Sequence, residues 1–310
     1  MSYYESQLEA YRKRRQWATY EVYLAALNKL RDYSRRSTGR TTLDFDQLTV
    51  SFIEGFRTYL IGHCGNGKNT VHKSLASIRT ILYAAIREGR FPQENNPFFQ
   101  IRLQREKRTK NKSIDIEDIW KIEDADLGEG RIIDVRNCFL FGFYNAGMRV
   151  SDVIQLQGRD IVQRRGIWRV EYEMEKTGVE SFSMPLLQTP ERILQSYGWP
   201  NVEADQYIFP FLPQHLQRGT REVFDFIKKK TSLMNKYLKI IQEKCEIETH
   251  LTTHVARHAL SHQLDRFGFD LGKIQDVLRH GDRSTTEVYI QRMRAGRFDE
   301  DLISALERSI

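Results

Sequence analysis

Apolar residues in the first hundred positions recur at the spacing of helices. From Glu5 to about Arg35, apolar and aromatic residues fall three or four apart, which predicts a first helix. Residues 41–65 predict a short extended lead into a second helix, which ends near the glycines between positions 62 and 67. This part of the chain has the pattern of a small helical bundle.

A third helical run covers residues 69–90. Asn69 and Thr70 are its candidate N-caps, and it closes at Gly89, a residue type that favours helix ends. The dipeptide Asn96-Pro97 then breaks the pattern, because a residue before proline avoids the helical region. We therefore expect an all-helical front of about 100 residues.

The remainder of the chain mixes two periodicities. Residues 113–127 and 131–147 predict two helices, of which the second is apolar nearly all round and hence buried. Residues 166–186 alternate with period two on both sides of Lys176-Thr177-Gly178, which predicts a β-hairpin. Helical spacing then returns over four segments, at about 220–245, 253–267, 270–278 and 284–293. The predicted fold class is mainly α, with a small antiparallel β-sheet in the rear part.

A basic segment separates the two parts. Residues 102–112, RLQREKRTKNK, are polar and lack apolar periodicity, so they predict a linker. Such a linker could lie along a phosphate backbone or serve only as a solvated joint. We expect a helical bundle at 1–101, the linker at 102–112 and a mixed, mostly helical domain at 113–310.

Charge is distributed unevenly along the 310 residues. Residues 1–110 hold 20 Lys and Arg against 10 Asp and Glu, so they carry +10, whereas the whole chain carries +7. A cationic front of this kind is typical of a chain that binds a polyanion, although a solvated basic surface gives the same count. Composition alone leaves these two interpretations open.

Composition also bears on compartment. No apolar run approaches the roughly 18 residues that span a bilayer, and the start of the chain lacks the apolar core of a signal peptide. Cys64, Cys138 and Cys245 are far apart and lie outside any metal-ligand spacing, which suits a reducing compartment. We expect a cytoplasmic protein with no membrane partner and no cysteine chemistry.

Two candidate anion-binding residues lie at predicted turns. Arg149 falls between a helix ended by Gly147 and a new helix for which Ser151 is a natural cap. A guanidinium beside free helix amides makes an anion site, although most such arginines are surface residues. Lys176 lies near the tip of the predicted hairpin, where its ammonium could reach into a groove or remain solvated.

Four histidines and an arginine cluster near the end of the chain. His254 and Arg257 are three apart and would share a helix face, while His258 and His262 would share another. A zinc site at the latter pair would lack the glutamate of the HExxH pattern and a nearby third ligand, so we expect no metal. His280 is followed nine residues later by Tyr289 on a predicted helix.

Two arginines, a lysine, two histidines and a tyrosine are the groups that phosphoryl transfer needs when no metal takes part. The segments that hold them, GMRVSDVIQL, KTGVESFSMPL, HVARH and LRHGDRSTTEVY, resemble the motif boxes of the tyrosine recombinase superfamily, the phage integrase and Xer type enzymes. The resemblance covers the whole chain and fills all six catalytic positions: Arg149, Lys176, His254, Arg257, His280 and Tyr289.

The resemblance implies both a domain assignment and a reaction. Residues 1–101 would be a SAM-like core-binding domain, and residues 113–310 the catalytic domain. Tyr289 would attack a DNA phosphate and form a 3′-phosphotyrosine, while Lys176 protonates the departing 5′ oxygen. Arg149 and Arg257, helped by His280, would hold the phosphate, with His254 as general base and no cofactor.

The implied function is site-specific DNA recombination, by integration, excision or inversion. The alternatives are a topoisomerase IB-like nicking and closing enzyme and a catalytically idle DNA-binding protein on the same fold. The implied partners are double-stranded DNA with inverted-repeat core sites and three further copies of the chain, which form a homotetramer on two DNA sites and exchange strands through a Holliday junction. A C-terminal amphipathic helix would dock on the neighbouring copy or on its own.

Two departures from the family pattern are visible. Arg279 replaces the usual glycine before His280, and Ala256 replaces the common leucine before Arg257. Neither removes a reacting group, but Arg279 adds positive charge beside the predicted phosphate site. The candidate DNA-contacting residues are Arg12, Arg15, Lys68, His72, Lys73, Arg79, Arg105, Lys107, Arg108, Lys110 and Arg279.

Overall fold

The computed structural model describes residues 2–40, 42–106, 114–174 and 183–279. Within these ranges the chain is mainly helical with one small antiparallel sheet, which confirms the predicted fold class. The residues group into two compact units, Met1–Thr109 and Lys110–Ile310. In the described ranges every helix is too short or too polar to span a bilayer.

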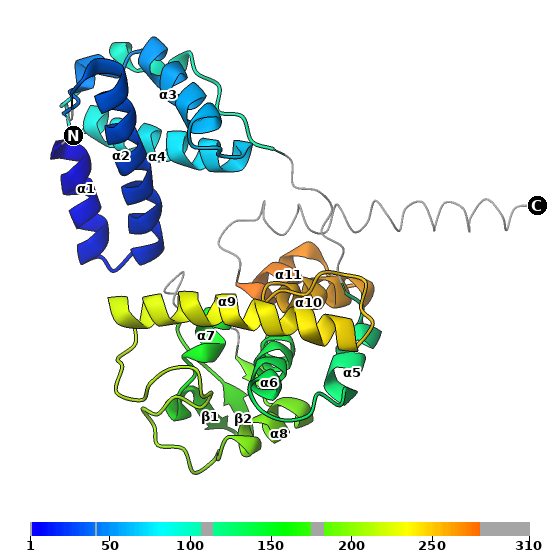
Figure 1. Cartoon of the computed structure of the whole chain (residues 1–310). Helices are drawn as coiled ribbons and strands as arrows, with labels where there is room; N and C mark the ends of the chain where they lie inside the picture. The colour runs from blue at the N-terminus through cyan, green and yellow to red at the C-terminus, as the bar shows by residue number, and fades with distance from the viewer. Residues whose placement is uncertain (1, 41, 107–113, 175–182, 280–310) are drawn as a thin grey trace, which may run out of the picture. The chain divides into compact units, whose positions relative to one another are not determined.

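In its described residues the first unit is a bundle of four helices, coloured blue to cyan in Figure 1. Its helices are α1 (Ser2–Lys13), α2 (Trp17–Thr38), α3 (Val50–Gly62) and α4 (Lys68–Arg87), with short 3-10 turns at Phe45–Gln47, Gln93–Asn95 and Pro97–Phe99. Helix α2 packs against the other three. Their apolar faces bury Leu27, Ile53, Phe56, Leu75 and Ile78 almost completely, so one core holds the bundle together.

The helix boundaries of the bundle differ from the prediction at two points. The first predicted helix is divided between α1 and α2, because Arg15 adopts a left-handed conformation with φ 56°. Gly67, not Asn69 or Thr70, is the N-cap of α4. The Asn69 side chain is used elsewhere, since its Oδ1 accepts a hydrogen bond from the backbone N–H of Glu106 at 3.2 Å.

The second unit is organised around the buried helix α6. Its helices are α5 (Ile116–Asp124), α6 (Arg131–Tyr144), α7 (Val150–Ile154), α8 (Gln188–Ser196), α9 (Arg221–Lys244), α10 (Val255–Arg266) and α11 (Leu271–Leu278), with a 3-10 turn at Gly158–Asp160. Helix α6 packs against α5, α7, α8, α9 and α10. Figure 1 shows the long α9 lying across α6. Helix α10 packs against both α6 and α11. The nearly all-apolar sequence of α6 matches this central position, as predicted.

The described part of the second unit also holds a three-stranded antiparallel sheet. Its strands are β1 (Ile161–Arg164), β2 (Ile167–Val170) and β3 (Met184–Pro185), in the order β1-β2-β3. Strand β2 pairs with β3 as the predicted hairpin requires, with Val170 opposite Met184. Strand β1 and its tight turn at Arg165-Gly166, where φ is 52° and 78°, were not predicted.

Candidate active site

The turn between α6 and α7 places Arg149. Ala146 and Gly147 both adopt positive φ, and the backbone N–H of Met148 donates to the carbonyl oxygens of Gly142 at 2.8 Å and Asn145 at 2.9 Å. This tight turn makes Arg149, rather than the predicted Ser151, the N-cap residue of α7. The reason is that the backbone leaves its extended conformation directly after Arg149, whose carbonyl oxygen accepts from the N–H of Asp152 at 2.8 Å.

The guanidinium of Arg149 is half-buried beside a thioether. Its Nη1 lies 3.5 Å from Sδ of Met174, and among the described residues no carboxylate forms an ion pair with it. A thioether is a weak acceptor, so it satisfies little of the hydrogen-bonding capacity of a charged group with five N–H donors. The surroundings of Arg149 therefore suit an anionic ligand.

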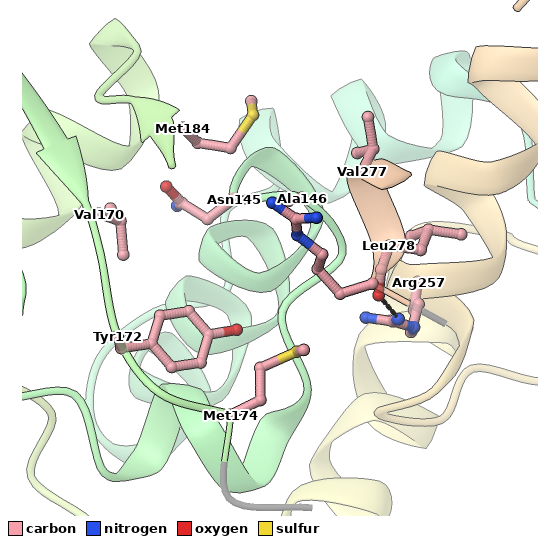
Figure 2. A pocket seen from close by; sticks show the side chains of 10 residues that line it. Asn145, Ala146, Val170, Tyr172, Met174, Met184, Arg257, Val277 and Leu278 are labelled. Carbon is pink, nitrogen blue, oxygen red and sulfur yellow. Dashed lines mark hydrogen bonds between the residues drawn. The ribbon is translucent and has the colours of Figure 1, made fainter. Parts of the chain in front are cut away.

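Arg257, on α10, joins three segments that are distant in the sequence. It is buried, with only 9% of its surface exposed. Its Nη1 donates to the carbonyl oxygen of Gly147 at 2.8 Å, and its Nη2 donates to the carbonyl oxygen of Leu278 at the end of α11. Figure 2 shows the bond from Arg257 to Leu278 as a dashed line. This one side chain therefore fixes the turn before Arg149 and the end of α11.

Gly147 is required by the packing of Arg257. Its φ is +62°, and a Cβ atom at this position would lie 3.1 Å from Cγ of Arg257 and 3.1 Å from Cδ2 of Leu278. These contacts are tighter than nine in ten real Cβ contacts, and the left-handed backbone is itself unfavourable for a residue with a side chain. The glycine allows Arg257 to approach the turn closely enough to reach its carbonyl oxygen.

The charges of Arg149 and Arg257 both influence the pKa of Tyr172. Burial raises the pKa of Tyr172 far above its ordinary value, and the charge of Asp152 raises it further. The charges of Arg257 and Arg149 oppose that shift, so both guanidinium groups lie close enough to influence the Tyr172 hydroxyl. The bond from Arg257 to the Gly147 carbonyl oxygen brings it close to the turn that carries Arg149. The two arginines are neighbours in the fold although α7, the sheet, α8 and α9 lie between them in the sequence.

A small cavity lies at this meeting point. Figure 2 shows the Tyr172 hydroxyl pointing into it. Its lining comes from the α6–α7 turn, the sheet, α10 and the end of α11, and consists of Asn145, Ala146, Val170, Tyr172, Met174, Met184, Arg257, Val277, Leu278 and Arg279. Arg149 borders the cavity through its contact with Met174.

His254 lies at the start of α10, one turn before Arg257. It is the N-cap residue of the helix and is exposed, whereas Arg257 is buried, and it does not line the cavity. His262, on another part of α10, has its Nδ1 3.3 Å from Oδ1 of Asp115. Within the described ranges no three His, Cys, Asp or Glu side chains are grouped to hold a metal ion.

Three of the six predicted catalytic residues, Lys176, His280 and Tyr289, lie outside the described residues. Met174 and Arg279 both line the cavity, and they precede Lys176 by two residues and His280 by one residue.

Comparison with known proteins identifies the family of the chain. Residues 123–295, more than half of the chain, match the model of the phage integrase family, and residues 1–101 match the phage integrase SAM-like domain. The chain belongs to the phage integrase family. The chain is a tyrosine-type DNA strand transferase, and its class of activity is site-specific recombination.

Curated relatives in this family have similar lengths. The chain is 26% identical over 261 residues to tyrosine recombinase XerD of Listeria innocua serovar 6a, covering 83% of this chain and 82% of that protein. It is 24% identical over 246 residues to tyrosine recombinase XerC of Alcanivorax borkumensis, covering 79% and 76%.

Solved structures in the family share the fold. The Tn1549 transposon integrase in complex with transposon right end DNA has a TM-score of 0.59 and 13% identity, covering 95% of this chain and 97% of that one. The XerH site-specific recombinase bound to difH has a TM-score of 0.58 and 16% identity, covering 90% and 78%. A lambda integrase dimer bound to a core site has a TM-score of 0.58 and 14% identity, covering 92% and 96%.

The first unit, whose sequence matches the phage integrase SAM-like domain, carries a basic cluster on α4. Lys68, His72 and Arg79 are spaced to share one helix face, and Arg105 lies near it. Burial lowers the pKa of His72, and the charges of Arg105 and then Arg79 lower it further, so both cations are close to the imidazole. We call Lys68, His72, Arg79 and Arg105 the α4 basic cluster.

The other candidate DNA-contacting residues are dispersed. Lys73 is exposed on α4 but lies one position from His72, so it points away from the shared face. Arg12 pairs with Glu9 at 2.9 Å, and Arg15 lies in the break between α1 and α2. Lys107, Arg108 and Lys110 lie outside the described residues.

Sequence reasoning missed Tyr172 and Met174 as parts of the integrase site. Their signal was the period-two pattern after position 166, which places Val170, Tyr172 and Met174 on one side of the chain. All three line the cavity. The pattern had predicted a hairpin but not which of its sides faces the arginines.

Proposed function

We propose that this recombinase cleaves and rejoins duplex DNA through Tyr289, with Arg149 and Arg257 holding the phosphate that Tyr289 attacks. The observation that carries the proposal is the convergence of the two arginines. Arg257 lines the cavity, and Arg149 contacts Met174, another lining residue, whose thioether is its only described side-chain hydrogen-bond partner. Two guanidinium groups in this position can stabilise the charge that develops on the nonbridging phosphate oxygens.

The proposed reaction needs no external energy source. The Tyr289 hydroxyl loses its proton to His254 as its oxygen forms a bond to phosphorus, and the bond from phosphorus to the 5′ oxygen breaks. Lys176 gives a proton to that 5′ oxygen, and His280 adds a hydrogen bond to the phosphate. Because the 3′-phosphotyrosine retains the energy of the broken bond, a 5′ hydroxyl of another strand can reverse the reaction and reseal the DNA.

The burial of Arg257 supports its assigned role. A guanidinium held by two backbone carbonyl oxygens has a fixed orientation before the phosphate arrives. Donors that are already oriented need no reorganisation as charge develops, and this is the main source of their catalytic effect. Removing one such donor typically costs about 100-fold to 1,000-fold in rate.

The proposed DNA partner is a duplex with inverted-repeat core sites, bound by four copies of the chain on two sites in the cytoplasm. Family relatives support DNA as the partner, since the matched structures include a recombinase bound to difH and an integrase dimer bound to a core site. The α4 basic cluster supplies cationic side chains that can contact phosphates.

Covalent trapping tests the proposal. Wild-type protein should leave DNA attached to Tyr289 after rapid denaturation of expressing cells, and sequencing that DNA identifies the target site. Tyr289→Phe should bind the same site and leave no adduct. An adduct in Tyr289→Phe would contradict the assignment of the nucleophile.

A plasmid bearing two copies of the recovered site distinguishes this function from its alternatives. A recombinase gives exchanged products, a nicking and closing enzyme gives relaxed plasmid only, and an idle binding protein gives a shifted band and no product. We expect exchanged products that depend on both Arg149 and Arg257.

A further inference from the structure

Arg279 has a backbone conformation that glycine ordinarily provides. It follows the last residue of α11 as its C-cap, with φ 48° and ψ 49°, in the left-handed region. Its N–H donates back to the carbonyl oxygens of Gln275 and Asp276. Helices often end this way, but the position favours glycine because a Cβ atom is strained there. An arginine at this point therefore lowers the stability of the fold relative to glycine.

The side chain of Arg279 reaches the site already described. It is exposed and lines the same cavity as Arg257 and Tyr172. Strained backbone positions that persist at a ligand site are a reason to look for a function of the side chain. Here the strained residue adds a guanidinium to the cavity that Arg257 lines and that Arg149 borders through Met174.

The backbone of Arg279 is held by Arg257 itself. Nη2 of Arg257 donates to the carbonyl oxygen of Leu278, which belongs to the peptide bond that joins Leu278 to Arg279. Arg257 therefore fixes the point from which the Arg279 side chain projects. Cations gathered at one cavity attract an anion, and a planar guanidinium suits phosphate oxygens because it can donate two parallel hydrogen bonds.

We propose that Arg279 is a third phosphate-binding arginine of the active site and donates to a nonbridging oxygen of the phosphate that Tyr289 attacks. The inference rests on the proposed function and extends it to a residue outside the six expected catalytic positions. Arg279 stabilises the pentacovalent transition state at the expense of some fold stability. Replacing it with glycine should therefore move stability and cleavage in opposite directions.

The test compares two arginine-to-glycine variants with the same backbone change. Arg279→Gly should raise Tm by about 2–4 °C, since it relieves a left-handed residue in a unit of this size. It should also lower the rate of adduct formation about 100-fold or more on a duplex carrying the site recovered from wild-type adducts. The matched control is Arg165→Gly, because Arg165 also has a positive φ, 52°, but lies in the β1–β2 turn and does not line the cavity.

Arg165→Gly should raise Tm similarly and cleave at the wild-type rate. Arg279→Lys keeps the charge but loses the two-pronged donor, so it should recover only part of the rate. Arg279→Asn tolerates the left-handed backbone and gives a second uncharged variant, should Arg279→Gly fail to fold. Its cleavage should fall as far as that of Arg279→Gly.

The experiment distinguishes a failure of the proposed function from a failure of the proposed role of Arg279. If wild-type protein forms no adduct at all, the proposed function is wrong. If wild-type forms the adduct and the uncharged Arg279 variants cleave at the rate of Arg165→Gly, Arg279 has no part in phosphate binding and the inference is overturned.

Discussion

Nη1 of Arg257 donates a 2.8 Å hydrogen bond to the carbonyl oxygen of Gly147, the residue two positions before Arg149. The bond joins α10 to the turn that carries the other arginine, so a change at either end should move both. Nη2 of Arg257 donates to the carbonyl oxygen of Leu278, so the end of α11 is tied to the same side chain. The spatial relation between the two arginines is therefore fixed by one buried side chain.

We expect Gly147→Ala to destabilise the fold and disable the enzyme. The new Cβ would need a left-handed backbone and would lie 3.1 Å from Cγ of Arg257. Together these should cost about 2–4 kcal/mol of unfolding free energy. Chemical denaturation measures that loss, and adduct formation should be lost even at temperatures where the variant remains folded.

Gly128→Ala is the control for the backbone contribution alone. Gly128 has φ +74° in the same unit, and a Cβ there would meet nothing within 4 Å. Its cost should be only about 1–2 kcal/mol, and cleavage should be retained. Equal losses of stability and activity in the two variants would mean that contact with Arg257 is unimportant.

Arg149→Lys and Arg257→Lys should separate catalytic from structural roles. Both should reduce cleavage about 100-fold to 1,000-fold, since an ammonium cannot replace the planar donors. Only Arg257→Lys should also lose stability, by about 1–3 kcal/mol, because it deprives two backbone carbonyl oxygens of their partner. Paired measurements of Tm and single-turnover cleavage check this, and a large Tm loss in Arg149→Lys would contradict it.

Most described helices of the second unit could be predicted because their apolar spacing is a local property of the sequence, whereas α8 was not predicted. The segments predicted at 113–127 and 131–147 contain α5 and α6, and three of the four later segments contain α9, α10 and α11. The break at Arg15 was not predictable in this way. The apolar positions on both sides of the break face the same core, so the periodicity continues across it.

The arrangement within the site was less accessible to sequence reasoning. The motif boxes identified Arg149 and Arg257 as partners, but the bonds from Arg257 to Gly147 and Leu278 depend on tertiary packing that no local pattern encodes. The N-cap position was misassigned to Ser151 for a related reason. Ser151 has a good capping side chain, whereas the tight turn at Ala146-Gly147 decides where α7 begins.

Tyr172→Phe should retain adduct formation. Tyr172 is the described tyrosine that points into the cavity, so it is the natural rival to Tyr289 as nucleophile. Burial and the Asp152 charge raise its pKa, which keeps its hydroxyl protonated across the working pH range and makes it a poor nucleophile. Mapping the DNA-linked peptide by mass spectrometry decides the matter, and linkage to residue 172 would overturn the role of Tyr289.

DNA binding by the SAM-like domain should strengthen as pH falls, because of His72. In the free protein, burial and the charges of Arg105 and Arg79 lower the pKa of His72, so the imidazole is neutral at pH 7. An unfolded chain binds the proton more readily, and unfolding free energy should therefore fall as pH drops below about 6.5. A DNA phosphate near the two arginines would offset their charge and raise the His72 pKa, so that binding takes up a proton.

Affinity for duplex DNA, measured from pH 8 to pH 5.5 at constant salt, should increase toward low pH in wild-type protein and change much less in His72→Gln. His63→Gln, which removes an exposed histidine at the end of α3, should keep the wild-type slope. A pH dependence in His72→Gln as steep as that of wild-type would show that the α4 basic cluster does not contact phosphate through this residue.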